Sequence, residues 1–243
     1  MSVKPALLLP VGGLEPVGPS CAVGIINEVT EFICSRLSDR CDILYAPLLS
    51  YAPTTAYRAF GGSIGIKKNI FESLIVNCVN DCAHWGIRTL FIFDGTFGAW
   101  GRLQDACSRI MKRRTNLVTV HAFNWQREKT IRSLIAQNID GRELGRSEFG
   151  IMSLASYFKP FLVRPLTDAK AGKDTLDEDV HNRWKKRGED PDKFRRLYPD
   201  CSTSYIAGGV DAQFGKALLD MVLDHYGNII NDALTDGMKD SDG

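Results

Sequence analysis

The sequence lacks an excess of charge of either sign. It has 30 Lys and Arg residues against 29 Asp and Glu residues, which gives a formal net charge of +1. A protein with this balance presents no general attractive field to a polyanion or to an anionic membrane surface. We therefore expect no nucleic acid and no membrane among its partners.

Long apolar runs are also missing. The longest runs, such as Thr89–Phe93, fall far short of the roughly 20 residues that cross a bilayer. Near the start, Ala6–Leu9 is too short for the core of a secretory signal, and no small-residue cleavage site follows it. The seven cysteines are odd in number and irregularly spaced, as in reduced proteins without disulfides. Together these features predict a cytoplasmic protein.

Fingerprints of common cofactors are absent as well. Two glycine-rich loops follow predicted strands, at residues 10–19 and 94–101. Neither has the Gly-x-Gly-x-x-Gly order of a dinucleotide site or the Gly-Lys-Ser/Thr of a phosphate-binding loop. The four histidines are scattered without the spacing of metal ligands: His84, His121, His181 and His225. We therefore predict no cofactor.

What the sequence does contain is an alternation of short apolar runs with helical periodicity. This alternation is typical of βαβ units with a parallel sheet. Strands are predicted at Ala6–Pro10, Asp42–Ala46, Thr89–Phe93 and Leu117–Ala122, and helices at Ile25–Arg36, Lys68–Trp85 and Gly101–Arg114. The second helix should end at Gly86, and its predicted apolar face consists of Ile70, Leu74, Val76, Val79 and Ala83.

The sequence as a whole predicts one domain over residues 1–234. Residues 165–200 are rich in charge and poor in apolar side chains, which indicates an exposed excursion or a partner-facing arm. An amphipathic helix over Asp211–Leu234 should return the chain to the core. Residues 235–243 are predicted to form a disordered tail.

Several segments resemble, in order, the motifs of the creatininase (creatinine amidohydrolase) family. The first is Leu-Leu-Leu-Pro-Val-Gly-Gly-Leu-Glu-Pro-Val-Gly-Pro at 7–19, where the family has a Leu-Pro-x-Gly-Ser-x-Glu-x-His-Gly-Pro opening. Others lie at 47–51, 60–64, 93–99, 148–156, 190–200 and 209–212. The resemblance implies a three-layer α/β fold with a mostly parallel central sheet flanked by helices. It also implies a homo-oligomer, typically a hexamer.

The family resemblance implies an amidohydrolase in which two divalent ions activate a bridging water. Such an enzyme opens a cyclic amide or removes a formyl group from a small nitrogen heterocycle. Of the ligands that the family would place, Glu15 is kept. The other positions hold Val17, Ser20, Ile26, Tyr57, Thr96, Gly98 or Ile151, and Glu148. Because such ions need several N or O ligands, we expect that the metal site has been lost.

One carboxylate among aliphatic replacements suggests proton transfer. Glu15 is the predicted catalytic acid or base, since apolar surroundings raise the pKa of a carboxyl group. The alternative is that Glu15 only ties down its own loop by accepting backbone N–H groups. Predicted substrate-binding residues are Asp94, Thr96, Tyr57, Arg58, Glu148, Trp100 and Trp125. The alternatives are a turn or helix cap for Asp94, a surface position for Tyr57 and Arg58, and core or subunit contacts for the two tryptophans.

Three functions remain open at this stage. The first is a metal-independent enzyme acting on a small nitrogen heterocycle or cyclic amide by ring opening, deformylation or cofactor-free oxidation. The second is a catalytically inactive relative that serves as a binding or scaffold subunit. The third is a metal-dependent amidohydrolase whose ligands come from new positions such as Glu148 and His121.

Overall fold

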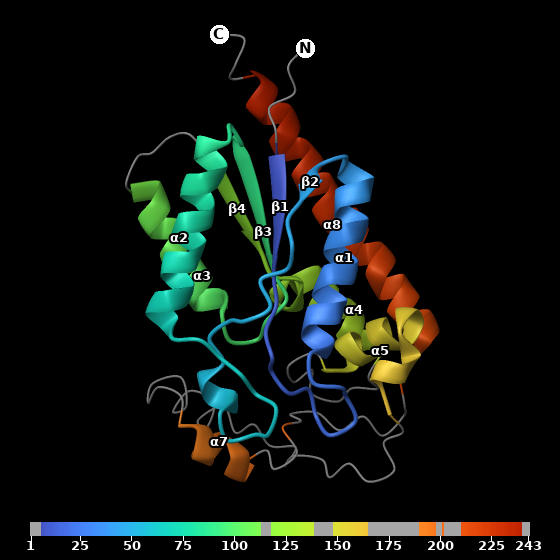
Figure 1. The fold of residues 1–243 in the computed structure, drawn as a ribbon. Helices are drawn as coiled ribbons and strands as arrows, with labels where there is room; N and C mark the ends of the chain where they lie inside the picture. The colour runs from blue at the N-terminus through green and yellow to red at the C-terminus, as the bar shows by residue number, and fades with distance from the viewer. Residues whose placement is uncertain are drawn as a thin grey trace.

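A computed structural model describes residues 6–112, 118–138, 148–164, 190–197, 201 and 210–239. Its centre is a parallel sheet with the strand order β2-β1-β3-β4 (Figure 1). The strands are β1 (Ala6–Val11), β2 (Leu44–Tyr45), β3 (Thr89–Asp94) and β4 (Thr119–Phe123). All four therefore direct their carboxyl ends toward one edge of the sheet.

The two central strands are the most apolar segments of the chain because both of their faces are covered. β1 and β3 pair along their whole length, with Leu8 opposite Phe91 and Val11 opposite Asp94. Leu8 and Phe91 contribute to the core on one face, and their neighbours Leu90 and Ile92 to the core on the other. This register places the loops that follow β1 and β3 side by side.

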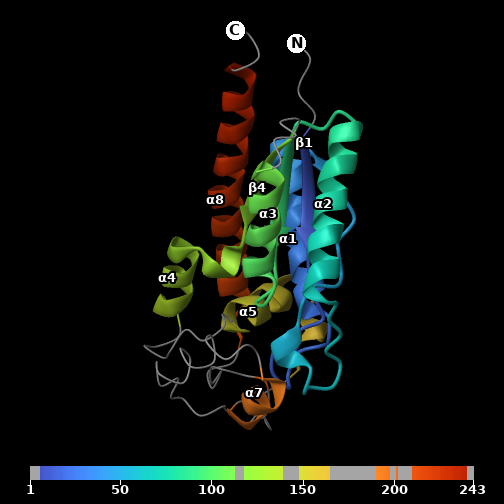
Figure 2. The same ribbon diagram turned by 90° about the vertical axis from the view of Figure 1, so that its left-hand side faces the viewer.

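Helices cover both faces of the sheet (Figures 1 and 2). On one face lie α1 (Ile25–Cys41) and α8 (Ala212–Lys239), and α5 (Glu148–Phe158) packs against both. On the other face α2 (Lys68–His84) packs against α3 (Trp100–Lys112). The predicted three-layer α/β fold is confirmed.

Short elements complete the described part of the chain. α4 (Lys129–Gln137) follows the 3-10 turn η2 (Trp125–Arg127), and η3 (Pro160–Leu162) follows α5. η1 (Thr55–Tyr57) lies between β2 and α2, and α7 (Pro191–Leu197) packs against it. Among the residues placed by the structure, no helix is long and apolar enough to cross a membrane.

The predicted second strand is too long, and the predicted first helix too short. α1 continues past Arg36 to Cys41, and Asp42 follows it with a left-handed φ of 50°. The Asp42 N–H donates to the carbonyl oxygen of Ser38, so this residue ends the helix instead of starting a strand. Only Leu44 and Tyr45 are left to pair with β1.

The predicted apolar face of α2 is correct at Val79 and wrong at Ile70 and Leu74. The buried residues are Phe71, Ile75, Val79 and Cys82, whereas the side chains of Ile70 and Leu74 are exposed. The prediction is displaced by one residue in the first half of the helix, where apolar residues on several sides leave the buried face undetermined by sequence. The predicted end at Gly86 is confirmed, because this glycine has a left-handed φ of 82°.

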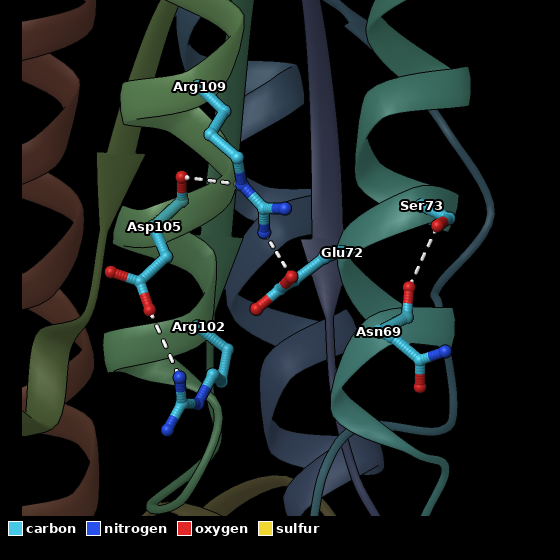
Figure 3. Close-up of polar contacts among 6 residues, drawn as sticks. All are labelled: Asn69, Glu72, Ser73, Arg102, Asp105 and Arg109. Carbon is cyan, nitrogen blue, oxygen red and sulfur yellow. Dashed lines mark hydrogen bonds and ion pairs between the residues drawn. The ribbon is translucent and has the colours of Figure 1, made fainter.

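The outer surface between α2 and α3 is polar (Figure 3). Arg109 of α3 donates to Glu72 of α2, and within α3 Arg102 donates to Asp105 at 3.2 Å. Arg102, Asp105 and Arg109 are exposed, whereas the Glu72 side chain is 15% exposed, and pairs with exposed partners add little to stability. We interpret this surface as a solvated face.

The end of the predicted charged excursion is attached to the body of the molecule. In α7 the buried Phe194 meets the ring of Tyr57 edge to face, with 5.5 Å between ring centroids, and Arg195 donates to the Ala59 carbonyl at 2.9 Å. Residues 165–189 of the excursion lie outside the described residues. α8 continues beyond Leu234 to Lys239, so residues 235–239 are helical and not part of a tail; residues 240–243 also lie outside the description.

Candidate active site

The loop after β3 is held through every backbone N–H from residue 95 to residue 99. The Gly95 N–H donates to Val11 O at 2.9 Å, which joins this loop to the end of β1. The Thr96 N–H donates to Asp94 Oδ1 at 2.8 Å, and the Ala99 N–H to Thr96 Oγ1 at 2.9 Å. Thr96 thereby holds the turn that precedes α3.

Glu15 accepts the two remaining N–H groups of this loop. Its Oε2 accepts from Phe97 N at 2.8 Å, and its Oε1 from Gly98 N at 3.1 Å. Glu15 is fully buried, and paired backbone N–H donors of this kind stabilise an ionised carboxylate. Glu15 thus fixes the loop after β3. The alternative in which it accepts N–H groups of its own loop does not describe these two contacts.

Asp94 ends β3 and is also fully buried. Burial raises the pKa of Asp94 from 3.8 to about 6. Hydrogen bonds from Thr96 and Asn124 and the nearby charge of Arg127 act in the opposite direction. A carboxyl group with this pKa can accept or donate a proton near neutral pH.

The carbonyl groups of the same loop are held from the opposite side by the segment after β4. Asn124 Nδ2 donates to Asp94 Oδ2 and to Thr96 O, both at 3.0 Å. Gln126 Nε2 donates to Gly95 O at 2.6 Å, and Arg127 Nη2 to Phe97 O at 3.2 Å. Asn124 and Gln126 are buried. Sequence reasoning missed both amides, which lie two and four residues beyond Ala122, the end of the predicted strand, and which reach the loop through the pairing of β3 with β4.

Tyr57 lies at the edge of this loop. An ideal Cβ placed on Gly98 would stand 3.1 Å from Glu15 Oε1 and 4.0 Å from Tyr57 Cε2, so the carboxylate and the phenol ring both border Gly98. Tyr57 is buried beneath Phe194, whereas its neighbour Arg58 is exposed. The structure thus groups Glu15, Asp94, Thr96 and Tyr57, and leaves Arg58 on the surface.

The other predicted binding residues are spread over the molecule. Trp100 packs with the core on the α2 and α3 face of the sheet. Trp125 is fully buried in the core on the α1 and α8 face. Glu148 is buried in the first turn of α5. The two indole rings therefore belong to different cores and do not form the two walls of one slot.

The positions that would carry metal ligands in the family do not fit a pair of divalent ions. Val17, Ile26 and Ile151 are 2%, 1% and 1% exposed and belong to one apolar core. Thr96 also stands at a position where the family would have a ligand, and its hydroxyl accepts the Ala99 N–H. The described part of the chain contains no group of three or more His, Cys, Asp or Glu that could hold a metal ion. His121 lies within β4 and stacks on Phe91, away from the strand end.

Comparison with known families identifies the fold. The Creatininase model, described as creatinine amidohydrolase, matches residues 2–230. The chain belongs to the creatininase family. A comparison with curated proteins finds no significant match.

Solved creatininase structures share the architecture. A mutant creatininase in complex with creatine superposes with a TM-score of 0.78 at 16% identity, covering 96% of this chain and 93% of that one. A mutant creatininase of the Zn-Zn type gives 0.76 at 17% identity, with 95% and 91% covered. A putative creatinine amidohydrolase from Bacteroides fragilis gives 0.68 at 16% identity, with 96% and 91% covered. At these identities the structures support the fold alone.

Proposed function

We propose that this creatininase-family protein acts on a small nitrogen heterocycle or cyclic amide without a pair of metal ions. The main support is that two buried carboxyl groups, Glu15 and Asp94, bind the loop after β3. This loop lies at the carboxyl ends of β1 and β3. Ligands of open parallel sheets bind at this edge. Two carboxyl groups in different environments can divide the roles of base and acid.

Glu15 is the proposed base. Its two backbone N–H partners fix the carboxyl group at the loop after β3, where a carboxylate can accept a proton from water. Asp94, with a pKa of about 6, is suited to return a proton to a leaving nitrogen. Ring opening by water balances in this scheme: water adds to the ring carbonyl carbon as Glu15 takes its proton, and the C–N bond breaks as Asp94 protonates the nitrogen.

A thermal-shift screen with lactams, pyrimidines and pteridines, followed by product analysis on each hit, tests this proposal. We expect at least one ring to raise the melting temperature and to be converted with a chelator present. Glu15→Gln should lower kcat by at least about 100-fold, the contribution typical of a general base. Unchanged turnover in Glu15→Gln would exclude Glu15 as the base, and absence of any turnover would remove the enzyme proposal.

A scaffold role is the second candidate, and one specific observation favours it. Both Glu15 oxygens are engaged by the backbone of a neighbouring loop, as expected of a structural residue. In that case a ligand would bind in the screen without conversion. The hexamer expected from the family resemblance stays a prediction, which sedimentation analysis of the purified protein tests.

A further inference from the structure

Three consecutive residues after β4 leave buried polar atoms without a hydrogen-bond partner. These atoms are Asn124 Oδ1, Trp125 Nε1 and Gln126 Oε1. All three residues are more than nine-tenths buried, at 4%, 0% and 4% exposed. A buried polar atom that lacks a partner costs stability, so a group that supplies the missing partner would bind there favourably.

The two amide groups cannot be turned to remove the deficit. Asn124 Nδ2 donates to a carboxylate oxygen of Asp94 and to Thr96 O. Exchanging Nδ2 with Oδ1 would set an acceptor against these two acceptors. The same holds for Gln126, whose Nε2 faces Gly95 O at 2.6 Å. The hydrogen-bond network therefore fixes both carbonyl oxygens as the unpartnered atoms.

Both amides are attached to the loop of the candidate active site through their nitrogen atoms. Their nitrogen atoms contact the carbonyl groups of adjacent residues, Gly95 and Thr96, in the loop that also carries the Glu15 contacts. Two unpartnered acceptor atoms, on residues that hold the loop of Asp94, disfavour anions and call for a ligand with hydrogen-bond donors.

We propose that Asn124 and Gln126 form a specificity-determining subsite, in which Asn124 Oδ1 and Gln126 Oε1 accept hydrogen bonds from the N–H groups of an uncharged ring. This inference deepens the proposed function and rests on it. An unsubstituted ring amide fits the subsite, and a ring with methylated nitrogens does not. Rejection is strong in such a site because a methylated ring leaves the two buried oxygens unpaired.

Calorimetric titration of the full chain with matched pairs of rings tests the subsite. The probes are hydantoin, dihydrouracil and 2-pyrrolidinone, each beside its fully N-methylated form. We expect at least one unsubstituted ring to bind about tenfold more tightly than its methylated counterpart. Equal affinity within every pair, or no binding of any unsubstituted ring, would overturn the proposal.

Variants of Gln126 give a second readout. Gln126→Met removes the acceptor and should weaken binding of the unsubstituted ring about tenfold, with little effect on a methylated ring, which has no N–H group to donate to this position. Gln137→Met, at the exposed end of α4, is the matched control and should change nothing. If Gln126→Met folds and binds like the unaltered protein, the subsite assignment is wrong. If Gln126→Met does not fold, the matched ring pairs decide on the unaltered protein.

The same samples separate this inference from the proposed function. Binding that depends on the ring N–H, without formation of a ring-opened product, would keep the subsite and remove the reaction on these rings. Turnover that is equal for unsubstituted and methylated rings would keep an enzyme and remove the subsite.

Discussion

At the scale of single residues, Glu15 substitutes for a bound anion. Two successive N–H groups just before α3 form a natural anion site, because the start of a helix carries a partial positive charge. The carboxylate of Glu15 occupies this site from a loop that lies 82 residues away in the sequence. Its position gives Glu15 a structural role that does not depend on a bound metal ion.

Glu15→Ala should therefore be rescued by a small carboxylate. The change leaves the N–H groups of Phe97 and Gly98 without their acceptor, and we expect a loss of about 3 kcal/mol in the free energy of unfolding. Formate should restore part of this loss in urea unfolding experiments, with no comparable effect on the unaltered protein. Equal stabilisation of both proteins by formate would argue against an anion site at this position.

Asp94 predicts how stability depends on pH. Its pKa in the folded protein is about 6 against an ordinary value of 3.8, so the folded state binds more protons between these values. The free energy of unfolding should therefore fall by up to about 3 kcal/mol as the pH rises from 4 to 6, and then level off. Asp94→Asn should abolish this decline, whereas Asp81→Asn on the exposed face of α2 should retain it. An identical slope in Asp94→Asn, measured by urea unfolding, would contradict the assignment.

At the scale of elements, α5 and α8 approach closely at one glycine. A Cβ on Gly215 would lie 2.0 Å from Ser153 O, which is a backbone atom and cannot move aside. On the same helix, a Cβ on Gly227 would meet only the flexible side chain of Arg40, with Nε at 3.1 Å, and Cys41 Sγ at 3.8 Å.

This contrast makes α8 a test with an internal control. Gly215→Ala should lower the free energy of unfolding by about 2 kcal/mol or more, since the two helices must separate. Gly227→Ala should be neutral or stabilise by up to about 1 kcal/mol, because alanine favours the helix. Thermal or urea unfolding measures both. Similar effects of the two changes would show that α5 and α8 are not in close contact at Gly215.

Element positions were predictable from the sequence where one local signal dominated. The ends of β1 and β3 follow from the apolar runs at Ala6 and Thr89, and Gly86 marks the end of α2. The apolar face of α2 was not predictable, because Ile70 and Leu74 offered the same periodicity as Phe71 and Ile75. Only packing against the sheet selects one of the two faces.

At the scale of the whole molecule, the fold could be predicted and the site only in part. The order of family-like segments gave the three-layer architecture, and the register of β1 and β3 brings Glu15 and Asp94 to one loop as strand-end positions suggest. The contribution of Asn124 and Gln126 could not be predicted. It depends on the pairing of β3 with β4, which no local pattern encodes.

At the same scale, the melting temperature of the protein should not depend on divalent ions. A resident metal stabilises the folded state in proportion to the logarithm of its concentration over its dissociation constant, so its removal lowers the melting temperature. With aliphatic side chains at Val17, Ile26 and Ile151, no such contribution is expected. The melting temperature in excess EDTA should match that in zinc or manganese to within about 1 °C, where a tightly bound metal would shift it by several degrees. Elemental analysis of protein purified without chelator provides the independent check, and stoichiometric zinc or manganese would mean that residues other than the family positions bind a metal.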